Sequence, residues 1–89
     1  MLIRKNPEIF AALLDNDWCI FIPSTASYLN LNSTGSFLWE LLEETDDFNI
    51  IVERVLETYN ISIEDCKEKL KNFFEHAETQ KIVHINYQK

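Results

Sequence analysis

The sequence has few residues that break regular structure, since its 89 residues include one glycine and two prolines. Turns must therefore be made by Asn, Asp and Ser, whose side chains can hydrogen-bond to the neighbouring backbone. Gly35 stands alone, which excludes a glycine-rich loop of the kind that cradles phosphate groups. No apolar run approaches the ~20 residues of a membrane span, and the first residues lack the features of a signal peptide. We therefore expect a cytoplasmic protein with no membrane partner.

Residue types that bind metals or act as nucleophiles are also scarce. The chain has two cysteines, Cys19 and Cys66, and two histidines, His76 and His84. They lack the spacing of metal ligands, and two cysteines are too few for a disulfide framework in so short a chain. Both cysteines lie among apolar residues, which disfavour a reactive thiolate, so we interpret them as reduced core residues. These absences predict a protein that is not an enzyme and uses no metal or cofactor.

Basic residues are outnumbered. The 8 Lys and Arg residues oppose 15 Asp and Glu residues, which leaves a formal net charge of -7. Such a charge repels nucleic acids, because neutralising phosphates requires clustered Lys and Arg. The acidic run at residues 43–47 lacks the alternating oxygen ligands of a calcium loop and is interpreted as a solvated helix end. We expect no nucleic-acid partner.

Hydrophobic residues make up 46% of the chain, enough for one modest core, so residues 1–89 are expected to form a single domain. Apolar segments at residues 9–14 and 18–22 flank the polar residues 15–17, a pattern that predicts a β-hairpin. Pro23 should end the second strand, because proline has no N–H group to donate to a ladder.

A third strand is predicted for residues 27–31, where side chains alternate between two faces. Leu29 and Leu31 share one face, and Tyr28 and Asn30 share the other. The three strands would form an antiparallel sheet in which the third strand is an edge unless another segment covers it. An open edge can also pair with a second copy, so both a monomer and an edge-strand dimer fit the sequence.

The rest of the chain shows apolar residues at helical spacing. The first predicted helix begins after an N-cap at Asn32 or Ser33. The second covers residues 48–59, and the third runs from Ser62 to near Thr79 or Gln80. The third has the clearest signal, because Ser62 and Asp65 have the spacing of a capping box. Residues 82–85 should form a short strand or an extended tail. The sequence therefore predicts an α+β fold, with two helices joined by a short turn as in a helix-turn-helix.

One stretch carries a family resemblance. From Tyr28 to Leu42 the chain reads YLNLNSTGSFLWELL. It resembles the Y-x-x-L-N-x-T-G-x-x-x-W-x-L-L stretch of PqqD-like proteins, the recognition elements for ribosomally made and post-translationally modified peptides (RiPPs). The resemblance extends in order and spacing over roughly residues 5–85. Two residues depart from it: Lys81 stands where many relatives have glycine, and Lys69 stands where many have an acidic residue.

The resemblance implies a winged helix-turn-helix-like fold, with a three-stranded antiparallel N-terminal sheet followed by three helices. It also implies that the leader segment of a precursor peptide adds as a further strand beside the third strand, against the third helix. The predicted edge strand supports this physically, because its unpaired N–H and C=O groups can pair with an extended peptide. The implied function is to deliver the leader to a modifying enzyme or leader protease of the same pathway.

Candidate peptide-binding residues lie on these two elements. On the third strand they are Tyr28, Leu29, Asn30 and Leu31. On a helical wheel of the third helix, one flank carries Asp65, Lys69, Asn72, Phe73 and His76. We favour this flank for the groove over the opposite flank, which the sequence leaves open. Phe73 would wall an apolar pocket, and Lys69 would pair with a leader carboxylate. Lys67 and Lys71 fall on the opposite flank.

The sequence leaves two other functions open. A winged-helix DNA-binding regulator would use the third helix for recognition, but that helix is net acidic and has no Arg to read guanine edges. A structural subunit, or a domain fragment of a larger enzyme, is the other alternative; the start at Met1 favours a free-standing protein.

Within the leading interpretation, a lasso-peptide pathway is favoured over a radical-SAM pathway, because small separate recognition proteins are usual in the former. The partner enzyme would need a second surface. The acidic face around Glu40, Glu43 and Glu44 is the candidate from charge alone.

Overall fold

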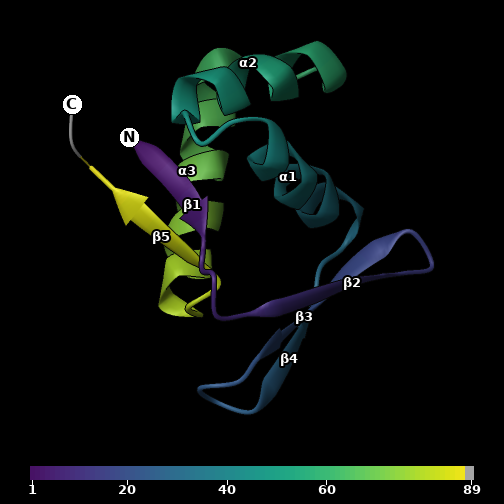
Figure 1. The fold of residues 1–89 in the computed structure, drawn as a ribbon. Coiled ribbons are helices and arrows are strands. Elements are labelled where there is room, and N and C mark those ends of the chain that lie inside the picture. The colour runs from purple at the N-terminus through teal and green to yellow at the C-terminus, as the bar shows by residue number, and fades with distance from the viewer. Residues whose placement is uncertain (88–89) are drawn as a thin grey trace.

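The computed structural model describes residues 1–87 and contains two small antiparallel sheets and three helices (Figure 1). In chain order the elements are β1 (Leu2–Lys5), β2 (Phe10–Leu14), β3 (Asp17–Ile22), β4 (Ser27–Asn30), α1 (Ser33–Glu44), α2 (Phe48–Thr58), α3 (Ile63–Thr79) and β5 (Val83–Asn86). The predicted α+β class, the three-stranded antiparallel sheet and the three helices are confirmed. α1 and α2 lie toward one end of the molecule and the β2–β3–β4 sheet lies toward the other, while α3 runs from the level of α2 down to the level of the sheet (Figure 1).

The β2–β3 hairpin has the predicted polar turn. Leu14 pairs with Asp17, and the two residues between them, Asp15 and Asn16, have φ values of 51° and 74°. A two-residue turn with positive φ at both positions matches the right-handed twist of the flanking strands. Asp and Asn tolerate that conformation better than most other residues, which explains how the turn forms without glycine.

The second sheet is one that the sequence does not predict. β1 pairs with β5, starting from Leu2 opposite Asn86. β1 has four residues and ends in two basic side chains, so it carries no clear periodic signal. Its pairing is instead stabilised by burial, because Ile3 and Val83 are both inside the core. For residues 82–85 the sequence predicted either a short strand or an extended tail, and β5 shows that a strand forms.

Each helix begins at a polar cap. The side chains of Asn32, Asp47 and Ser62 accept hydrogen bonds from the N–H groups of Gly35, Asn49 and Asp65 over 2.8, 2.8 and 3.2 Å. These bonds satisfy donors that a first helical turn leaves unpaired. The Ser62 half of the predicted capping box is therefore formed.

The end of α3 explains the unusual residue Lys81. Its φ is 68°, in the left-handed region where glycine is favoured. The N–H groups of Lys81 and Ile82 donate to the C=O groups of Glu78 and Ala77, which closes the helix end. The Asn6 side chain donates to the Lys81 C=O over 2.8 Å. Lys81 thus adopts the conformation that glycine usually adopts at a helix end, and these hydrogen bonds stabilise it.

One core joins the two sheets and the helices. α3 contributes Cys66, Leu70, Phe74 and Ala77 to it. The thiol of Cys66 is buried, and burial raises its pKa above the ordinary value. Within residues 1–87, no helix is both long and apolar enough to cross a membrane.

Candidate functional site

The free edge of β4 is the first component of the site. Among the residues that the structure describes, β4 pairs on one side, with β3. The N–H of Leu31 donates to the C=O of Trp18 over 2.9 Å, and hydrogen-bonded pairs alternate along an antiparallel ladder. The N–H and C=O groups of Leu29 therefore also point to β3, whereas those of Tyr28 and Asn30 point to the free edge. An extended peptide can pair with these groups.

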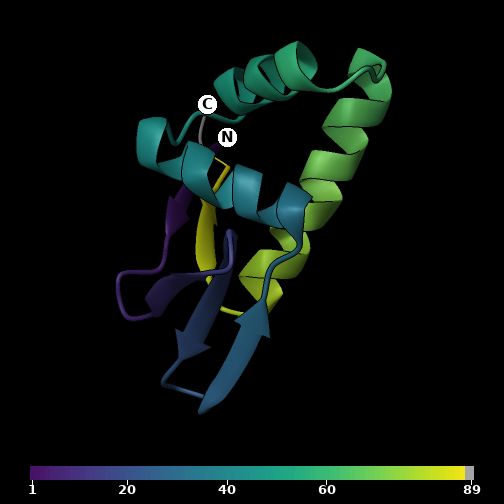
Figure 2. The same cartoon turned by 90° about the vertical axis from the view of Figure 1, so that its right-hand side faces the viewer.

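Two adjoining hollows separate this edge from the C-terminal half of α3, which stands beside β4 (Figure 2). The first has a volume of about 180 Å³ and is lined by Leu29, Leu31, Phe73 and His76 among others. The second has about 230 Å³ and lies next to Tyr28. They share Leu29 and Gln80, so together they form one channel, which we call the β4–α3 groove.

Phe73 forms the apolar wall of the groove. Its ring is half-buried and packs edge-on against Phe74, with ring centroids 5.2 Å apart. Because Phe74 is in the core, this contact holds the Phe73 ring in place. His76 lies one turn further along α3 on the same flank and is exposed. The flank that carries Phe73 and His76 is therefore the one that faces β4.

Lys69 lies outside the β4–α3 groove, at the rim of a neighbouring hollow of about 350 Å³. This hollow is enclosed by the start of α1, the end of α2 and α3, and its lining is mainly apolar. Lys69 is one turn from Phe73, and Thr34 is next to Gly35, so the hollow continues the line of the groove. No ion pair in residues 1–87 involves Lys69, which leaves its ammonium group available to a ligand.

Two predicted residues are not gathered with the others. Asn72 lines a hollow on another side of α3, together with Lys67 and Lys71. Asp65 is exposed in the first turn of α3, about 16 Å along the helix axis from His76. The structure therefore brings together the strand residues with Phe73 and His76, sets Lys69 next to them, and leaves Asn72 and Asp65 apart.

Several residues of the groove were missed in the sequence. Gln80 lines both hollows and follows His76 by four residues, so a wheel continued through the helix end would have included it. Thr79 and Lys81 line the second hollow. Thr79 is the last residue of α3, whereas the placement of Lys81 depends on the left-handed turn that follows the helix, which no periodic pattern encodes.

The described part of the chain shows no cluster of three His, Cys, Asp or Glu side chains that could hold a metal ion. In the groove, polar backbone groups of β4 face a half-buried aromatic ring across a channel open to solvent. This arrangement is suited to binding an extended chain, with main-chain hydrogen bonds on one side and side-chain pockets on the other.

The sequence matches a protein-family model described as coenzyme PQQ synthesis protein D (PqqD), over residues 17–83. No curated protein matches the chain.

Two solved structures share the fold. One is described as TbiB1 in complex with the TbiA(beta) leader peptide; it is 20% identical, with a TM-score of 0.87 over 96% of this chain and 99% of that chain. The other is described as lasso peptide synthetase B1 complexed with the leader peptide; it is 15% identical, with a TM-score of 0.84 over 96% of this chain and 100% of that chain.

Proposed function

Because this chain belongs to the PqqD family, we propose that it binds the leader segment of a ribosomally synthesised precursor peptide in the β4–α3 groove. The observation that carries the proposal is the free edge of β4, which lies open beside the Phe73 flank of α3. The two solved structures of the same fold contain, by their descriptions, a leader peptide. This supports the proposal and favours a lasso-peptide pathway.

The leader binds as an added strand. Its backbone pairs with the outward N–H and C=O groups of Tyr28 and Asn30, which supply affinity for any extended sequence. Its side chains alternate, so every second one enters the groove, where Leu29 and Phe73 offer apolar contact. These pockets supply the selectivity. A disordered leader loses entropy when it becomes a strand, so the complex should be moderate in affinity and reversible.

Lys69 adds an electrostatic contact. Lys69 lies one turn before Phe73 on α3, and its ammonium group pairs with a carboxylate of the leader. Asp65 and Asn72, which lie away from the groove, contact the leader only where it extends past the paired segment.

The role of the protein is delivery and not chemistry. Holding the leader in the groove raises the local concentration of the precursor at a modifying enzyme or leader protease. The chain itself needs no cofactor for this.

A proline placed at the free edge tests strand addition directly. In Asn30→Pro the lost N–H is one that points away from β3, so the β3–β4 ladder is retained and the fold should survive. The matched control is Ala11→Pro. Leu14 and Asp17 form a hydrogen-bonded pair beside the turn, and such pairs alternate along the ladder, so the N–H of Ala11 points to the free edge of β2. Circular dichroism checks the fold of both variants.

Binding is measured by fluorescence anisotropy with labelled leader peptides from precursor genes beside this one. We expect saturable binding by the wild type and by Ala11→Pro, and binding at least about tenfold weaker for Asn30→Pro. A folded wild type that binds none of these leaders would show the proposed function to be wrong. Equal binding by Asn30→Pro would show that the leader binds without pairing to β4.

A further inference from the structure

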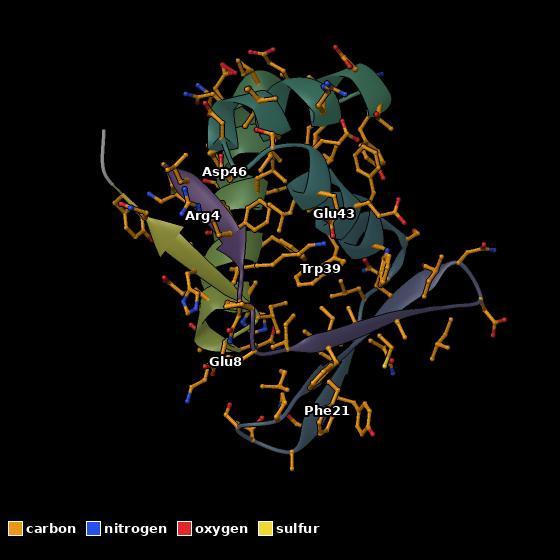
Figure 3. All side chains as sticks on the ribbon, viewed as in Figure 1. Arg4, Glu8, Phe21, Trp39, Glu43 and Asp46 are labelled. Carbon is orange, nitrogen blue, oxygen red and sulfur yellow. The ribbon has the colours of Figure 1, made fainter. Side chains whose placement is uncertain are left out.

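The outer face of the β2–β3–β4 sheet, which points away from the core, is apolar. Its positions follow from the strand register: Phe10, Ala12 and Leu14 from β2, Asp17, Cys19 and Phe21 from β3, and Tyr28 and Asn30 from β4. Asp17 is the one charged member. Phe21 lies in the part of the sheet that is remote from the helices (Figure 3).

Three aromatic rings cross this face as a ladder, one from each strand. The ring centroids of Phe10 and Phe21 are 6.5 Å apart, and those of Phe21 and Tyr28 are 4.9 Å apart. Phe10 and Tyr28 are 67% and 72% exposed. The opposite face of the sheet is covered, because Ile20 and Ile22 are in the core. An antiparallel sheet with one covered face normally carries polar residues on the other, so this sheet departs from the usual pattern.

The β2–β3 hairpin extends the apolar surface. All five residues of β2 are exposed, and Leu13 and Leu14, on opposite faces near the turn, are 51% and 59% exposed. β2 is an edge strand without a charged residue or a proline, although edges that face water usually carry one. Contiguous apolar surface of this kind commonly marks a site of protein association.

We propose that this outer face is the docking surface for the enzyme that acts on the bound leader, and that the enzyme covers it with an apolar patch whose rim is neutral or basic. The proposal rests on the proposed function. The groove binds the leader but offers no surface for the enzyme, and the outer face would supply that surface.

The outer face adjoins the groove, and this position favours the leader-processing enzyme as the partner that covers it. The aromatic ladder ends at Tyr28, on the strand whose free edge receives the leader. An added strand extends the sheet by one position, and those of its side chains that point away from the groove lie on the outer face. An enzyme docked on the ladder therefore also contacts the leader.

Charge argues against a second copy of the chain as the occupant. Each copy has a net charge of -7, so two copies repel each other. A partner with a neutral or basic rim meets no such repulsion, and the acidic total of this chain attracts it.

The acidic face of α1, favoured by the sequence alone, is less suited to docking. Glu40 accepts a hydrogen bond from the Trp18 indole over 2.9 Å, and Glu43 accepts one from Lys5 over 2.7 Å. The Glu43 side chain points toward β1 and lies near Trp39 (Figure 3). Glu44 pairs with Arg54 over 3.1 Å. All three carboxylates already have internal partners.

The test removes the outer apolar surface of β2 and leaves the groove intact. Phe10→Thr with Leu14→Thr keeps residues that favour strands, at positions two strands away from the free edge of β4. The control, Ile50→Thr, removes an exposed apolar side chain from α2. Leader affinity is measured by anisotropy. Binding to the purified leader-processing enzyme encoded beside the precursor gene is measured by calorimetry, with leader present.

We expect the double variant to bind the leader as tightly as the wild type and to bind the enzyme at least about tenfold more weakly. The Ile50→Thr control should match the wild type in both. Enzyme binding unchanged in the double variant, or absent in the wild type, would overturn the inference while the groove function stands. A wild type that forms a dimer which the double variant loses would overturn it in favour of a second copy. Failure of the wild type to bind any leader would overturn the function on which it rests.

Discussion

Gly35 lies against Phe73 across the floor of the groove. A methyl group on Gly35 would lie 3.5 Å from Cε1 of Phe73, 3.4 Å from Cβ of Leu31 and 3.3 Å from the capping oxygen of Asn32. Because Gly35 has no side chain, the start of α1 can lie close to both the end of β4 and α3.

Gly35→Ala should consequently separate binding from stability. Alanine favours the helix by about 1 kcal/mol over glycine, but the close oxygen of Asn32 opposes this gain. The free energy of unfolding should thus change by less than about 1 kcal/mol, while the added methyl narrows the groove and weakens leader binding several-fold. Urea denaturation and anisotropy measure the two effects. Unchanged leader affinity would place the leader away from Phe73.

Lys69→Glu should weaken leader binding by charge reversal. Lys69 makes no ion pair within residues 1–87, so the free energy of unfolding should change by less than about 0.5 kcal/mol. The loss of affinity should shrink as salt is added, because screening weakens exposed charge pairs. Lys71→Glu, on another side of α3, is the matched control and should leave affinity unchanged. Equal losses in both variants would indicate a general effect of net charge.

Lys81→Gly should stabilise the fold. The φ of 68° at Lys81 is strained for lysine and relaxed for glycine, and the difference is about 1 kcal/mol. Lys71→Gly, at an exposed position inside α3, should instead destabilise the fold by a similar amount, since glycine is unfavourable within a helix. Urea denaturation midpoints compare the two. A destabilised Lys81→Gly would mean that contacts of the lysine side chain outweigh the strain.

The pair of Lys5 and Glu43 should make stability depend on acid pH. The hydrogen bond from Lys5, with its charge, holds the pKa of Glu43 below the ordinary value of 4.5. A pKa that is lower in the folded state gives stability that is present above the unfolded value and is lost as the pH falls through the folded value. Since Glu43 is largely exposed, the contribution should be below about 1 kcal/mol.

Glu43→Gln should therefore lower stability slightly at neutral pH and leave it unchanged at pH values below the folded pKa. Urea denaturation of both proteins across the acid range measures this difference. A constant difference at all pH values would assign the effect to packing near Trp39, over whose ring Lys5 also lies at 4.4 Å.

The features that the sequence predicted well are those with local signals. The hairpin turn at Asp15 and Asn16 and the cap at Ser62 depend on side chains that bond to their own neighbourhood, and both are present. The alternation of Leu29 with Tyr28 on β4 follows from strand geometry and is confirmed by burial on one side and exposure on the other.

Features that depend on distant contacts were not predictable in this way. β1 is a strand because β5 lies beside it, although some eighty residues separate them in sequence. On the helical wheel Asn72 and Phe73 fall within one arc of about 100°. The sector of α3 that faces β4 is narrower, because it holds Phe73 and His76 but not Asn72. The groove role of each residue stays a prediction until a leader is titrated.

The β1–β5 pairing also sets Leu2 opposite Asn86, so the two ends of the fold are neighbours. In Figure 2 the N-terminal end of the chain lies behind α1, well above the place where β4 and the end of α3 lie side by side. A loop of a few residues can therefore join the two ends of the fold into a hairpin, and new ends can be opened at the exposed turn of Asp15 and Asn16. The order of the elements along the chain is thus separable from their arrangement in space, and a circularly permuted form should keep the same shape.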